Sequence, residues 1–582
     1  MRTIGIDLGT TNSLAAYWLD GKVQLIPQES ERLMLPSVVG LDETGGIFVG
    51  SLAKERRVVH SNNTFGSFKC FMGTEKKYEM GGKCYTPVDF SAMVLAQIKS
   101  NAEAFLGEPV EEAIISVPAY FNDQQRSDTK KAAKIAGLKV ERLINEPSAA
   151  ALAYRMERRE QSQNLLVFDF GGGTLDLSLV ECFGNMIEIV AIVGDNHLGG
   201  DDIDQAIVGY WCRVNGLQYE LISGRDQSNM LKKAEQLKIA LSKGDGHEIT
   251  EKLWLECGCF DVTLSEDKLF ELCLPLFEKI KKLFLKILKD SDYHVSDIDD
   301  LIMVGGSSKV PVVKKFLKEM LGKDPILFDA PDYAVAYGVG VYAGIRERKE
   351  DIKDIVLTDV CPFTLGTGTI RGKNDYKAHM FPMIERNSTL PASCRHIFTT
   401  SKDFQTEVSV TVYQGEEYEL EDNVFLGSLD ISVPPRRAGK EMIIVDFTYD
   451  VNGILQVEVT NSDGEKKELV IANHEMTEEE LQFHMEAMKE VRIQPVMQEE
   501  NILLIERAAK LYEQALGERR EQIGCLIQWF YDSLLSGRMT IVAKAVAYMK
   551  EQLETMETSL EQDEKIYFDG SLKLPDLSGE HE

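Results

Sequence analysis

The chain has 582 residues, of which 44% are hydrophobic and 27% charged, and its formal net charge is −30. A single hydrophobic core stops growing at about 250–300 residues, so this length predicts several folded domains. Because nucleic-acid backbones recruit basic surfaces, the excess of acidic residues argues against a nucleic-acid partner.

The start of the chain, MRTIGID, is not followed by the long apolar region of a secretory signal, and no stretch approaches the roughly 20 apolar residues of a membrane span. We therefore expect a cytoplasmic protein without a membrane partner. Ten cysteines are scattered along the chain, which favours reduced thiols. The only close pair is Cys257 and Cys259, and a zinc site there would need two more ligands at matching spacing, which the sequence does not supply.

The part of the chain up to about residue 350 alternates short apolar runs with amphipathic stretches, which is the pattern of an α/β fold. Helices are expected at 91–107 and 125–137, the second of them closed by a glycine. The strand-like runs each end in Gly, Pro or Ser and are TIGIDLG (3–9), AIISVP (113–118), LLVFDFGGG (165–173) and DLIMVGGSS (300–308).

From about residue 355 to 472 the sequence changes to short alternating strands, with Asp463-Gly464 as one hairpin turn. After His474 it becomes helical and rich in charge. These changes predict an α/β part, a β part and a helical part in that order.

Two segments of the α/β part repeat one plan. IGIDLGTTNSLAAYWL and LVFDFGGGTLDLSLVE each pass from a β-segment through Asp, an apolar residue and Gly to a second β-segment, and Asp7 and Asp169 are the equivalent carboxylates. A tight Gly-Thr turn between two strands presents successive backbone amides to an anion. A single copy fits turn chemistry alone equally well, whereas two copies predict a duplicated fold with two phosphate loops facing one cleft.

The chain has no GxxxxGK[ST] motif, so it is not a P-loop enzyme. Each hairpin nevertheless places a carboxylate, Asp7 or Asp169, beside the expected phosphates, and Asp176 follows shortly after. Carboxylates repel phosphates unless a cation lies between them, and Mg²⁺ takes few protein ligands while keeping several waters. The sequence therefore predicts a clamp for magnesium and phosphate between the two hairpins.

Six blocks, in order along the chain, resemble the signature blocks of the DnaK-type, seventy-kilodalton heat-shock chaperones. The resemblance covers at least residues 3–472, and a specialised HscC-like bacterial branch is one option within that family. The blocks are IDLGTTNS (6–13), VPAYFNDQQR (117–126), INEPSAAALAY (144–154), FDFGGGTLDLS (168–178), GDNHLGGDDID (194–204) and VGGSSKVPVV (304–313).

The resemblance implies a division of the chain. Residues 1–350 would form an α/β actin-like nucleotide-binding (ATPase) domain and 351–360 an interdomain linker. Residues 361–474 would form a β-sandwich substrate-binding domain, and 475–582 an α-helical lid that is short for the family. The apolar run 355–357 in the linker would dock on the ATPase domain in the ATP state.

The resemblance also implies ATP or ADP, Mg²⁺ and K⁺ as cofactors. Asp7, Glu146 and Asp169 would surround Mg²⁺ through water, and Lys69, by itself an ordinary surface lysine, would position the attacking water. Thr174 would act in catalysis and Asp176 would lie near the monovalent cation. The nucleotide-binding residues would be Gly9, Thr10, Thr11, Asn12, Gly171, Gly172, Gly173 and Thr174 at the phosphates, and Glu235, Lys238, Ser242, Gly305, Gly306, Ser307, Lys309 and Asp332 at the nucleoside.

Two residues of the nucleoside pocket depart from the family pattern. The family commonly places arginines on either face of the adenine, whereas this sequence has Ile239 and Lys309 there. A guanidinium stacks on a base better than an ammonium group, and isoleucine offers apolar contact alone. We expect weaker nucleotide binding than in a member that carries both arginines.

The resemblance assigns a peptide groove to the β part. Thr367 and Ser401 are more polar than the residues the family usually has there, which predicts a narrower or more polar peptide preference. For Phe398, Val408 and Val410, a plain sandwich core is the alternative interpretation. The implied groove residues are Thr367, Thr369, Ile370, Phe398, Ser401, Val408 and Val410.

The resemblance further implies communication with partners. Pro118 and Arg126 match relay positions between the domains, and Arg142, Asn145 and Asp359 match positions that engage a J-domain cochaperone. A J-domain partner is therefore expected. The need for a nucleotide exchange factor stays open, because the segment 74–87 near the cleft rim is short.

The function implied is that of an ATP-dependent molecular chaperone in protein folding and stress response. It would bind and release extended apolar segments of unfolded or client polypeptides as it hydrolyses ATP. A small-molecule kinase of the actin and hexokinase superfamily, or a filament-forming actin-like protein, would share the twin phosphate loops. Neither has a use for residues 355–582.

Overall fold

A computed structural model gives the fold in two compact units, residues 1–481 and 482–582, and each is described by itself. The described residues are 2–29, 32–41, 46–56, 63–140, 142–157, 162–244, 248–349, 352, 355–370, 377–451, 453–472, 499–515, 518–535 and 539–567.

The first large sheet of the first unit has six strands. Its centre is the hairpin β1–β2, which contains the first predicted phosphate loop, and β10 lies parallel to β1 on the other side. The strand order is β11 (Leu143–Asn145), β10 (Glu112–Val117), β1 (Thr3–Asp7), β2 (Asn12–Leu19) and β3 (Lys22–Ile26), and β4 (Leu35–Pro36) also pairs with β2.

The second large sheet repeats this arrangement. The hairpin β12–β13 contains the second predicted phosphate loop, and β17 lies parallel to β12 as β10 does to β1. The duplication expected from the two sequence segments is therefore present in the strand pairing. The order is β18 (Ile326–Leu327), β17 (Asp300–Val304), β12 (Gln163–Phe170), β13 (Leu175–Phe183), β14 (Met186–Asp195) and β19 (Val356–Thr358).

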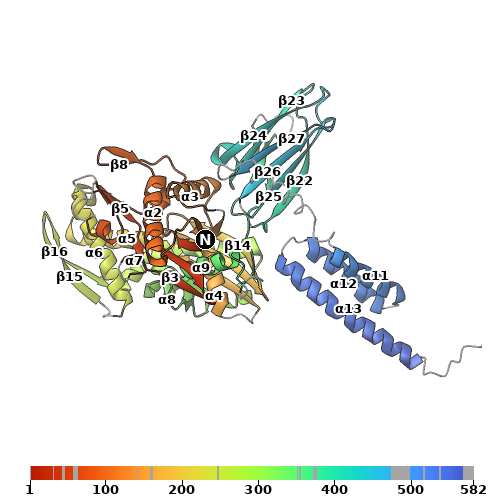
Figure 1. The fold of residues 1–582 in the computed structure, drawn as a ribbon, viewed down its shortest axis with the longest axis horizontal. Helices are drawn as coiled ribbons and strands as arrows, with labels where there is room; N and C mark the ends of the chain where they lie inside the picture. The colour runs from red at the N-terminus through yellow and green to blue at the C-terminus, as the bar shows by residue number, and fades with distance from the viewer. Residues whose placement is uncertain are drawn as a thin grey trace, which may run out of the picture. The chain divides into compact units, whose positions relative to one another are not determined.

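Smaller sheets and helices complete the α/β part (Figure 1). The small sheets are β5 (Val38–Leu41), β6 (Ile47–Val49) and β7 (Thr64–Gly66); β8 (Tyr78–Met80) and β9 (Lys83–Tyr85); and β15 (Glu248–Leu255) and β16 (Gly258–Ser265). The helices are α1 (Ser51–Arg56), α2 (Pro87–Leu106), α3 (Asp123–Ile135), α4 (Glu146–Glu157), α5 (Gly200–Asn215), α6 (Gly224–Ser242), α7 (Glu266–Ser291), α8 (Pro311–Leu321) and α9 (Ala334–Arg346).

Helices α4 and α9 join the two large sheets. α9 contacts β1 and β2, α4 contacts β12 and β13, and the two helices pack on each other. Their crossing is so close that a Cβ on Gly338 would lie 1.8 Å from the carbonyl oxygen of Ala149. Glycine is therefore needed at this position, and the close contact fixes the distance between the two phosphate loops.

The linker forms a short strand of the second sheet. β19 pairs in parallel with β14, with Met186 opposite Val356 and Glu188 opposite Thr358. Part of the predicted linker, at 351, 353 and 354, lies outside the described residues. The apolar run that sequence analysis expected to dock thus adds to the sheet of the second phosphate loop.

After the linker, two four-stranded antiparallel sheets share one apolar core, which makes this part a β-sandwich (Figure 1). One sheet has the order β21 (His379–Ile384), β20 (Leu365–Thr369), β23 (Glu407–Gln414) and β24 (Val424–Ser432). The other has the order β22 (Ala392–Thr399), β25 (Met442–Tyr449), β26 (Ile454–Thr460) and β27 (Lys466–Ala472).

The sandwich contacts the α/β part through a buried aspartate. Asp123, at the first turn of α3, accepts hydrogen bonds from the amide nitrogen of Gln414 at 3.0 Å and from the hydroxyl of Tyr449 at 3.0 Å. The Asp123 backbone N–H donates to the side-chain oxygen of Gln414 at 3.1 Å. All three residues are buried, so the contact excludes water.

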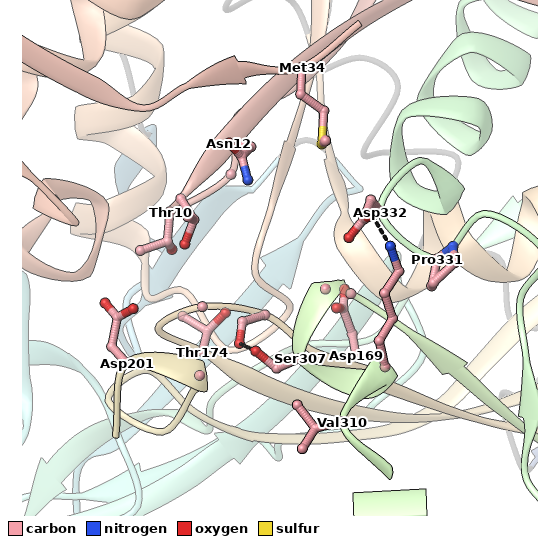
Figure 2. Close-up of a pocket in the computed structure, with 18 of the residues that line it drawn as sticks. Thr10, Asn12, Met34, Asp169, Thr174, Asp201, Ser307, Val310, Pro331 and Asp332 are labelled. Atoms are coloured by element: carbon pink, nitrogen blue, oxygen red, sulfur yellow. Dashed lines mark hydrogen bonds and ion pairs between the residues drawn. The ribbon is translucent and has the colours of Figure 1, made fainter. Parts of the chain in front are cut away.

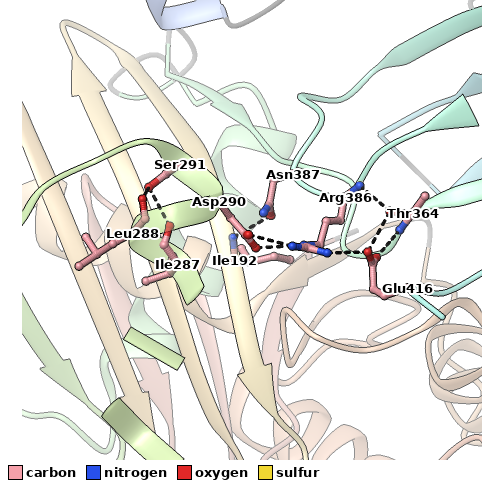
Figure 3. A network of polar contacts seen from close by, with 9 residues as sticks. All are labelled: Ile192, Ile287, Leu288, Asp290, Ser291, Thr364, Arg386, Asn387 and Glu416. Atoms are coloured by element: carbon pink, nitrogen blue, oxygen red, sulfur yellow. Dashed lines mark hydrogen bonds and ion pairs between the residues drawn. The ribbon is translucent and has the colours of Figure 1, made fainter. Parts of the chain in front are cut away.

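A second contact between the same parts is ionic (Figure 3). The Arg386 guanidinium binds both carboxylate oxygens of Asp290, near the end of α7, at 2.8 and 3.0 Å. It also donates to Glu416 at 2.6 Å, and Glu416 in turn accepts from the backbone N–H of Thr364 at 2.8 Å. This network connects α7 to two loops of the sandwich.

The second unit is helical. Its core is formed by side chains of the three helices that the structure describes there, among them Leu511, Phe530 and Met549. The predicted boundary at 474/475 lies outside the described residues. Among the helices that the structure describes, none is long and apolar enough to cross a membrane. The helices are α11 (Glu499–Gln514), α12 (Glu518–Leu535) and α13 (Met539–Tyr567).

The crossing of α4 and α9 gives a test of the fold. Gly338→Ala should lower the free energy of unfolding by about 1–3 kcal/mol or more, because the new methyl group overpacks a closed contact. Gly209→Ala is the matched control in α5, since its Cβ would meet nothing closer than 3.9 Å. Thermal unfolding should show a lower Tm for the first variant alone, and equal Tm values for both variants would contradict the described crossing.

Candidate functional site

The two predicted phosphate loops face one cavity of about 480 Å³ (Figure 2). In Figure 2, Thr10 and Asn12 lie on one side of it, and Thr174 and Ser307 on the other. The predicted residues that line it are Asp7, Gly9, Thr10, Thr11, Asn12, Lys69, Glu146, Asp169, Gly171, Gly172, Thr174, Glu235, Lys238, Ser242, Gly305, Gly306, Ser307, Lys309 and Asp332.

The loops require glycine because they approach each other closely. A Cβ on Gly172 would lie 2.0 Å from the hydroxyl oxygen of Thr11 in the opposite loop. That hydroxyl is buried and has no hydrogen-bond partner among the described residues. An anion between the loops would supply the missing partner, which fits the predicted phosphate site.

One ammonium group lies among the carboxylates at the floor of the cavity. The Nζ of Lys69 is 2.5 Å from a carboxylate oxygen of Glu146, and both side chains are buried. Asp7 accepts a hydrogen bond from the Ser116 hydroxyl at 2.8 Å, and Asp169 lies in register with Asp176 on the second hairpin. Lys69 is thus held by tertiary contacts and is not a solvated surface lysine.

Burial makes the charged state of these carboxyl groups unfavourable. It raises the pKa of Asp7 to about 7, and the negative charge of Glu146 adds to the rise, whereas Lys69 and Ser116 oppose it. Burial and Glu146 likewise raise the pKa of Asp176 to about 7, against a hydrogen bond from the Tyr120 amide. The pKa of Asp169 is also raised, first by burial and then by the neighbouring carboxylates.

The donor set fits a divalent cation with oxygen ligands. Burial raises the pKa of Asp7, Asp169 and Asp176, and Lys69 is the one ammonium group described beside them, so a bound cation would favour their ionised forms. Asp7, Glu146 and Asp169 line the cavity and are the residues that would hold it through water, as Mg²⁺ prefers.

Two predicted residues lie away from the cavity itself. Gly173 lines a neighbouring cavity of about 490 Å³ that also contacts Thr10 and Thr11. Asp176 is 1% exposed and accepts from the backbone N–H of Tyr120 at 3.3 Å. Gly173 therefore faces the neighbouring cavity from the second loop itself, whereas Asp176 lies buried behind that loop.

The nucleoside end of the cavity is organised by two lysines. Lys238 binds a carboxylate oxygen of Asp204 at 2.8 Å and the carbonyl of Gly200 at 3.0 Å. Lys309 forms an ion pair with Asp332, drawn as a dashed line in Figure 2. Ile239 is 44% exposed and lines the same space. The expected weak stacking on adenine stays a prediction. In the structure the Lys309 ammonium group is paired with the carboxylate of Asp332.

Several lining residues were not predicted. Asp201 and Asp204 belong to the GDNHLGGDDID block, so the signal for them was present in the sequence. Asp201 also accepts from the Ser67 hydroxyl at 3.0 Å across the cleft. Met34 precedes β4 and its side chain points into the cavity in Figure 2, and nothing in its local sequence marks it.

Only some of the predicted groove residues lie together in the structure. Val410 is buried in the sandwich core, with Phe398 and Val408 packed against it, as the alternative interpretation expected. Thr367 is 2% exposed and lies opposite Phe381 and Val412 in the strand register. Of the other three residues, Ile370 and Ser401 are exposed and Thr369 is half-buried.

The predicted relay residue Arg126 is connected by hydrogen bonds to Asn145 and Asp359, two of the positions predicted to engage a J-domain cochaperone. Arg126 donates to the carbonyl of Phe121 at 3.0 Å and to the side-chain oxygen of Asn145 at 2.7 Å. Asn145 in turn donates to the carboxylate of Asp359 at 2.6 Å, next to the linker strand.

The two remaining residues of the relay prediction lie close by. Arg142 lines the same small cavity as Arg126, Asn145 and Asp359, whereas Pro118 is buried and its carbonyl accepts from the Phe121 N–H at 3.2 Å.

Comparison with known proteins identifies the family. A model of the Hsp70 protein family matches residues 3–80 and 74–566. The chain belongs to the Hsp70 family. Chaperone protein DnaK of Thermotoga neapolitana is 39% identical over 544 residues, and that of Thermosipho africanus 38% over 538 residues. Each alignment covers 89% of both chains.

Membership of the Hsp70 family confirms the predicted chaperone class and ATP hydrolase activity. It also supports ATP or ADP with Mg²⁺ as the cofactors of the site. The kinase alternative is not favoured, because the match extends through the sandwich and into the helical unit.

Asp7 gives a test that separates chemistry from folding. Asp7→Asn should lower ATP turnover by about 10²–10³, the usual cost of losing one electrostatic group in a reaction site. The amide oxygen still accepts from Ser116, so the fold should be kept. Single-turnover ATP hydrolysis with Mg²⁺ measures the first effect, and Asp20→Asn, at an exposed turn residue that does not line the cavity, is the matched charge-removing control.

The stability of the same variant has a defined pH dependence. The folded chain holds the Asp7 proton up to about pH 7, whereas the unfolded chain loses it near 3.8, so rising pH through that window destabilises wild type. Without Mg²⁺, Asp7→Asn should therefore have a higher Tm than wild type near pH 8, with the difference vanishing near pH 4. A lower Tm for the variant near pH 8 would overturn this assignment.

Proposed function

We propose that the chain is an ATP-driven clamp for extended apolar segments of polypeptides, in which the nucleotide cavity controls the sandwich. The observation that carries the proposal is the joining of the two parts: the linker strand extends the sheet of the second phosphate loop, and Asp123 and Asp290 bind donors from the sandwich. A change in one part therefore alters bonds made by the other.

In the proposed reaction the chain's own residues position and polarise the phosphate groups and the attacking water. The amides of the two loops and the hydroxyls of Thr10, Thr11 and Thr174 would hold phosphate oxygens, while Lys69, held by Glu146, would orient the attacking water. Bound Mg²⁺ would supply the positive charge that the buried carboxylates require. Phosphoryl transfer in such a site depends on positioning and charge stabilisation.

The relay residues support the proposed communication. The chain from Arg126 through Asn145 to Asp359 links α3, the start of α4 and the linker. Asp123, at the start of the same helix α3 as Arg126, binds Gln414 and Tyr449. Binding of nucleotide and of peptide would be coupled by the same free energy in both directions. A J-domain cochaperone would act at Arg142, Asn145 and Asp359, and K⁺ would lie near Asp176.

The main test compares nucleotide states. Peptide affinity should be about fivefold or more weaker with ATP than with ADP, and an unfolded peptide should raise ATP turnover in turn. Lys69→Ala is the informative variant, because it should block hydrolysis and keep the ATP-induced loss of peptide affinity. Stimulation of turnover by sugars and not by peptide would refute the proposal and favour a kinase.

The surroundings of Thr367 support the predicted preference of the groove for more polar peptides. Its hydroxyl is buried without a hydrogen-bond partner among the described residues, and a buried hydroxyl without a partner is unfavourable. A bound peptide that offers a polar side chain or backbone group at this position would remove that cost.

Thr367→Val tests this preference with an isosteric change. Binding of an all-aliphatic peptide should tighten by about tenfold, corresponding to about 1.4 kcal/mol, and a peptide with a central serine should lose its advantage. Thr460→Val, at a half-buried position of β26 outside the predicted groove, should leave the ranking of peptides unchanged. Equal effects of the two variants on peptide ranking would show that Thr367 does not set the preference.

A further inference from the structure

The tip of the β15–β16 hairpin carries two exposed thiols. A two-residue turn, Glu256 and Cys257, joins the strands, and the register pairs Leu255 with Gly258 and Trp254 with Cys259. Cys257 and Cys259 are both free and exposed, whereas Leu253, Leu255, Val262 and Leu264 of the same hairpin are buried in the core. Both thiols therefore face solvent, with one glycine between them.

The backbone permits these thiols to meet. Even in a fully extended segment, residues two apart have Cα atoms about 6.4–6.8 Å apart, which is still within the range of about 4.4–6.8 Å found in disulfides. Cys257 lies in the turn, where the chain is less extended than in a strand. Gly258 has φ +148°, in a region open to glycine, and an added Cβ there would meet no atom closer than 3.7 Å. A small contraction at this glycine brings the pair into bonding range.

The other cysteines differ from this pair. Burial raises the pKa of the Cys70 thiol to about 11 and that of Cys273 to about 12, which keeps both protonated and unreactive. Cys84 and Cys525 are exposed, but neither has another cysteine within ten positions along the chain. The hairpin tip combines exposure with a neighbouring thiol.

We propose that Cys257 and Cys259 form a reversible disulfide that links the redox state of the surroundings to helix α6. The oxidant is a low-molecular-weight disulfide of the glutathione class. One cysteine thiolate attacks a sulfur of that disulfide, forming a mixed disulfide and releasing one thiol. The second cysteine then attacks the first, releasing the second thiol and losing its proton to water.

The hairpin tip is bonded to the helix that lines the nucleotide cavity. The N–H of Glu256 donates to the buried carboxylate of Asp226 at 2.8 Å, and the carbonyl of Trp254 accepts from the Asn229 side chain at 3.0 Å. Asp226 and Asn229 lie in the first turns of α6, which later carries Glu235 and Lys238. Because the disulfide draws the turn together, it displaces the Glu256 N–H and the Trp254 carbonyl. These groups bind Asp226 and Asn229, so α6 is displaced with them.

The pairing is tested on the full chain equilibrated in glutathione buffers of increasing oxidised fraction. After trapping and proteolysis, the peptide that contains both cysteines should have lost two hydrogens, and dithiothreitol should restore them. Cys257→Ser and Cys259→Ser should each take up one glutathione instead. Cys84→Ser is the matched control and should keep the linked pair. Separate glutathione adducts on both cysteines of wild type would overturn the proposal.

The link to α6 has its own readout. Oxidation of wild type should change the dissociation rate of a fluorescent adenine nucleotide by about fivefold, the lower end of typical coupling between sites. The two serine variants should show the same rate under oxidising and reducing conditions. A linked pair with an unchanged nucleotide dissociation rate would overturn the coupling to α6.

Discussion

The structure depends on a single imbalance of charge: the buried carboxyl groups of Asp7, Glu146 and Asp169 line the cavity together with the ammonium group of Lys69, and Asp176 is buried behind them. In water each carboxylate would be ionised and solvated, but here burial removes that solvation, and only a cation can replace it. A cation bound between the two predicted phosphate loops would therefore favour the ionised form of these carboxyl groups. Nucleotide with its metal completes this part of the protein.

The rest of the α/β part serves to keep the two loops at a fixed separation. The loops belong to different sheets, and the sheets are held together by α4 and α9, which touch backbone to backbone at Gly338. A looser crossing would let Gly172 and Thr11 move apart, and with them the amides that face the anion. Packing far from the reacting atoms thus decides the geometry at the phosphates.

Sequence analysis found the parts of the site that are encoded locally. The two hairpins could be predicted because Asp, Gly and Thr occur in one order twice, and two long helices could be predicted from their amphipathic pattern, at 91–107 for α2 and 125–137 for α3. Their N-terminal caps, Thr86 and Asn122, were not predicted. Contacts between distant segments gave no local signal. The bonds from Asp123 to Gln414 join residues 291 positions apart, and Met34 enters the cavity from a loop with no motif.

The linker strand has a further role that is independent of catalysis. β14 has β13 on one side and β19 on the other, so three linker residues cover the open edge of a six-stranded sheet. An uncovered edge presents free N–H and C=O groups that pair with any extended chain, a second copy of the protein included. A shortened chain that ends before residue 356 would lack this cover, and β14 would become a free edge open to pairing.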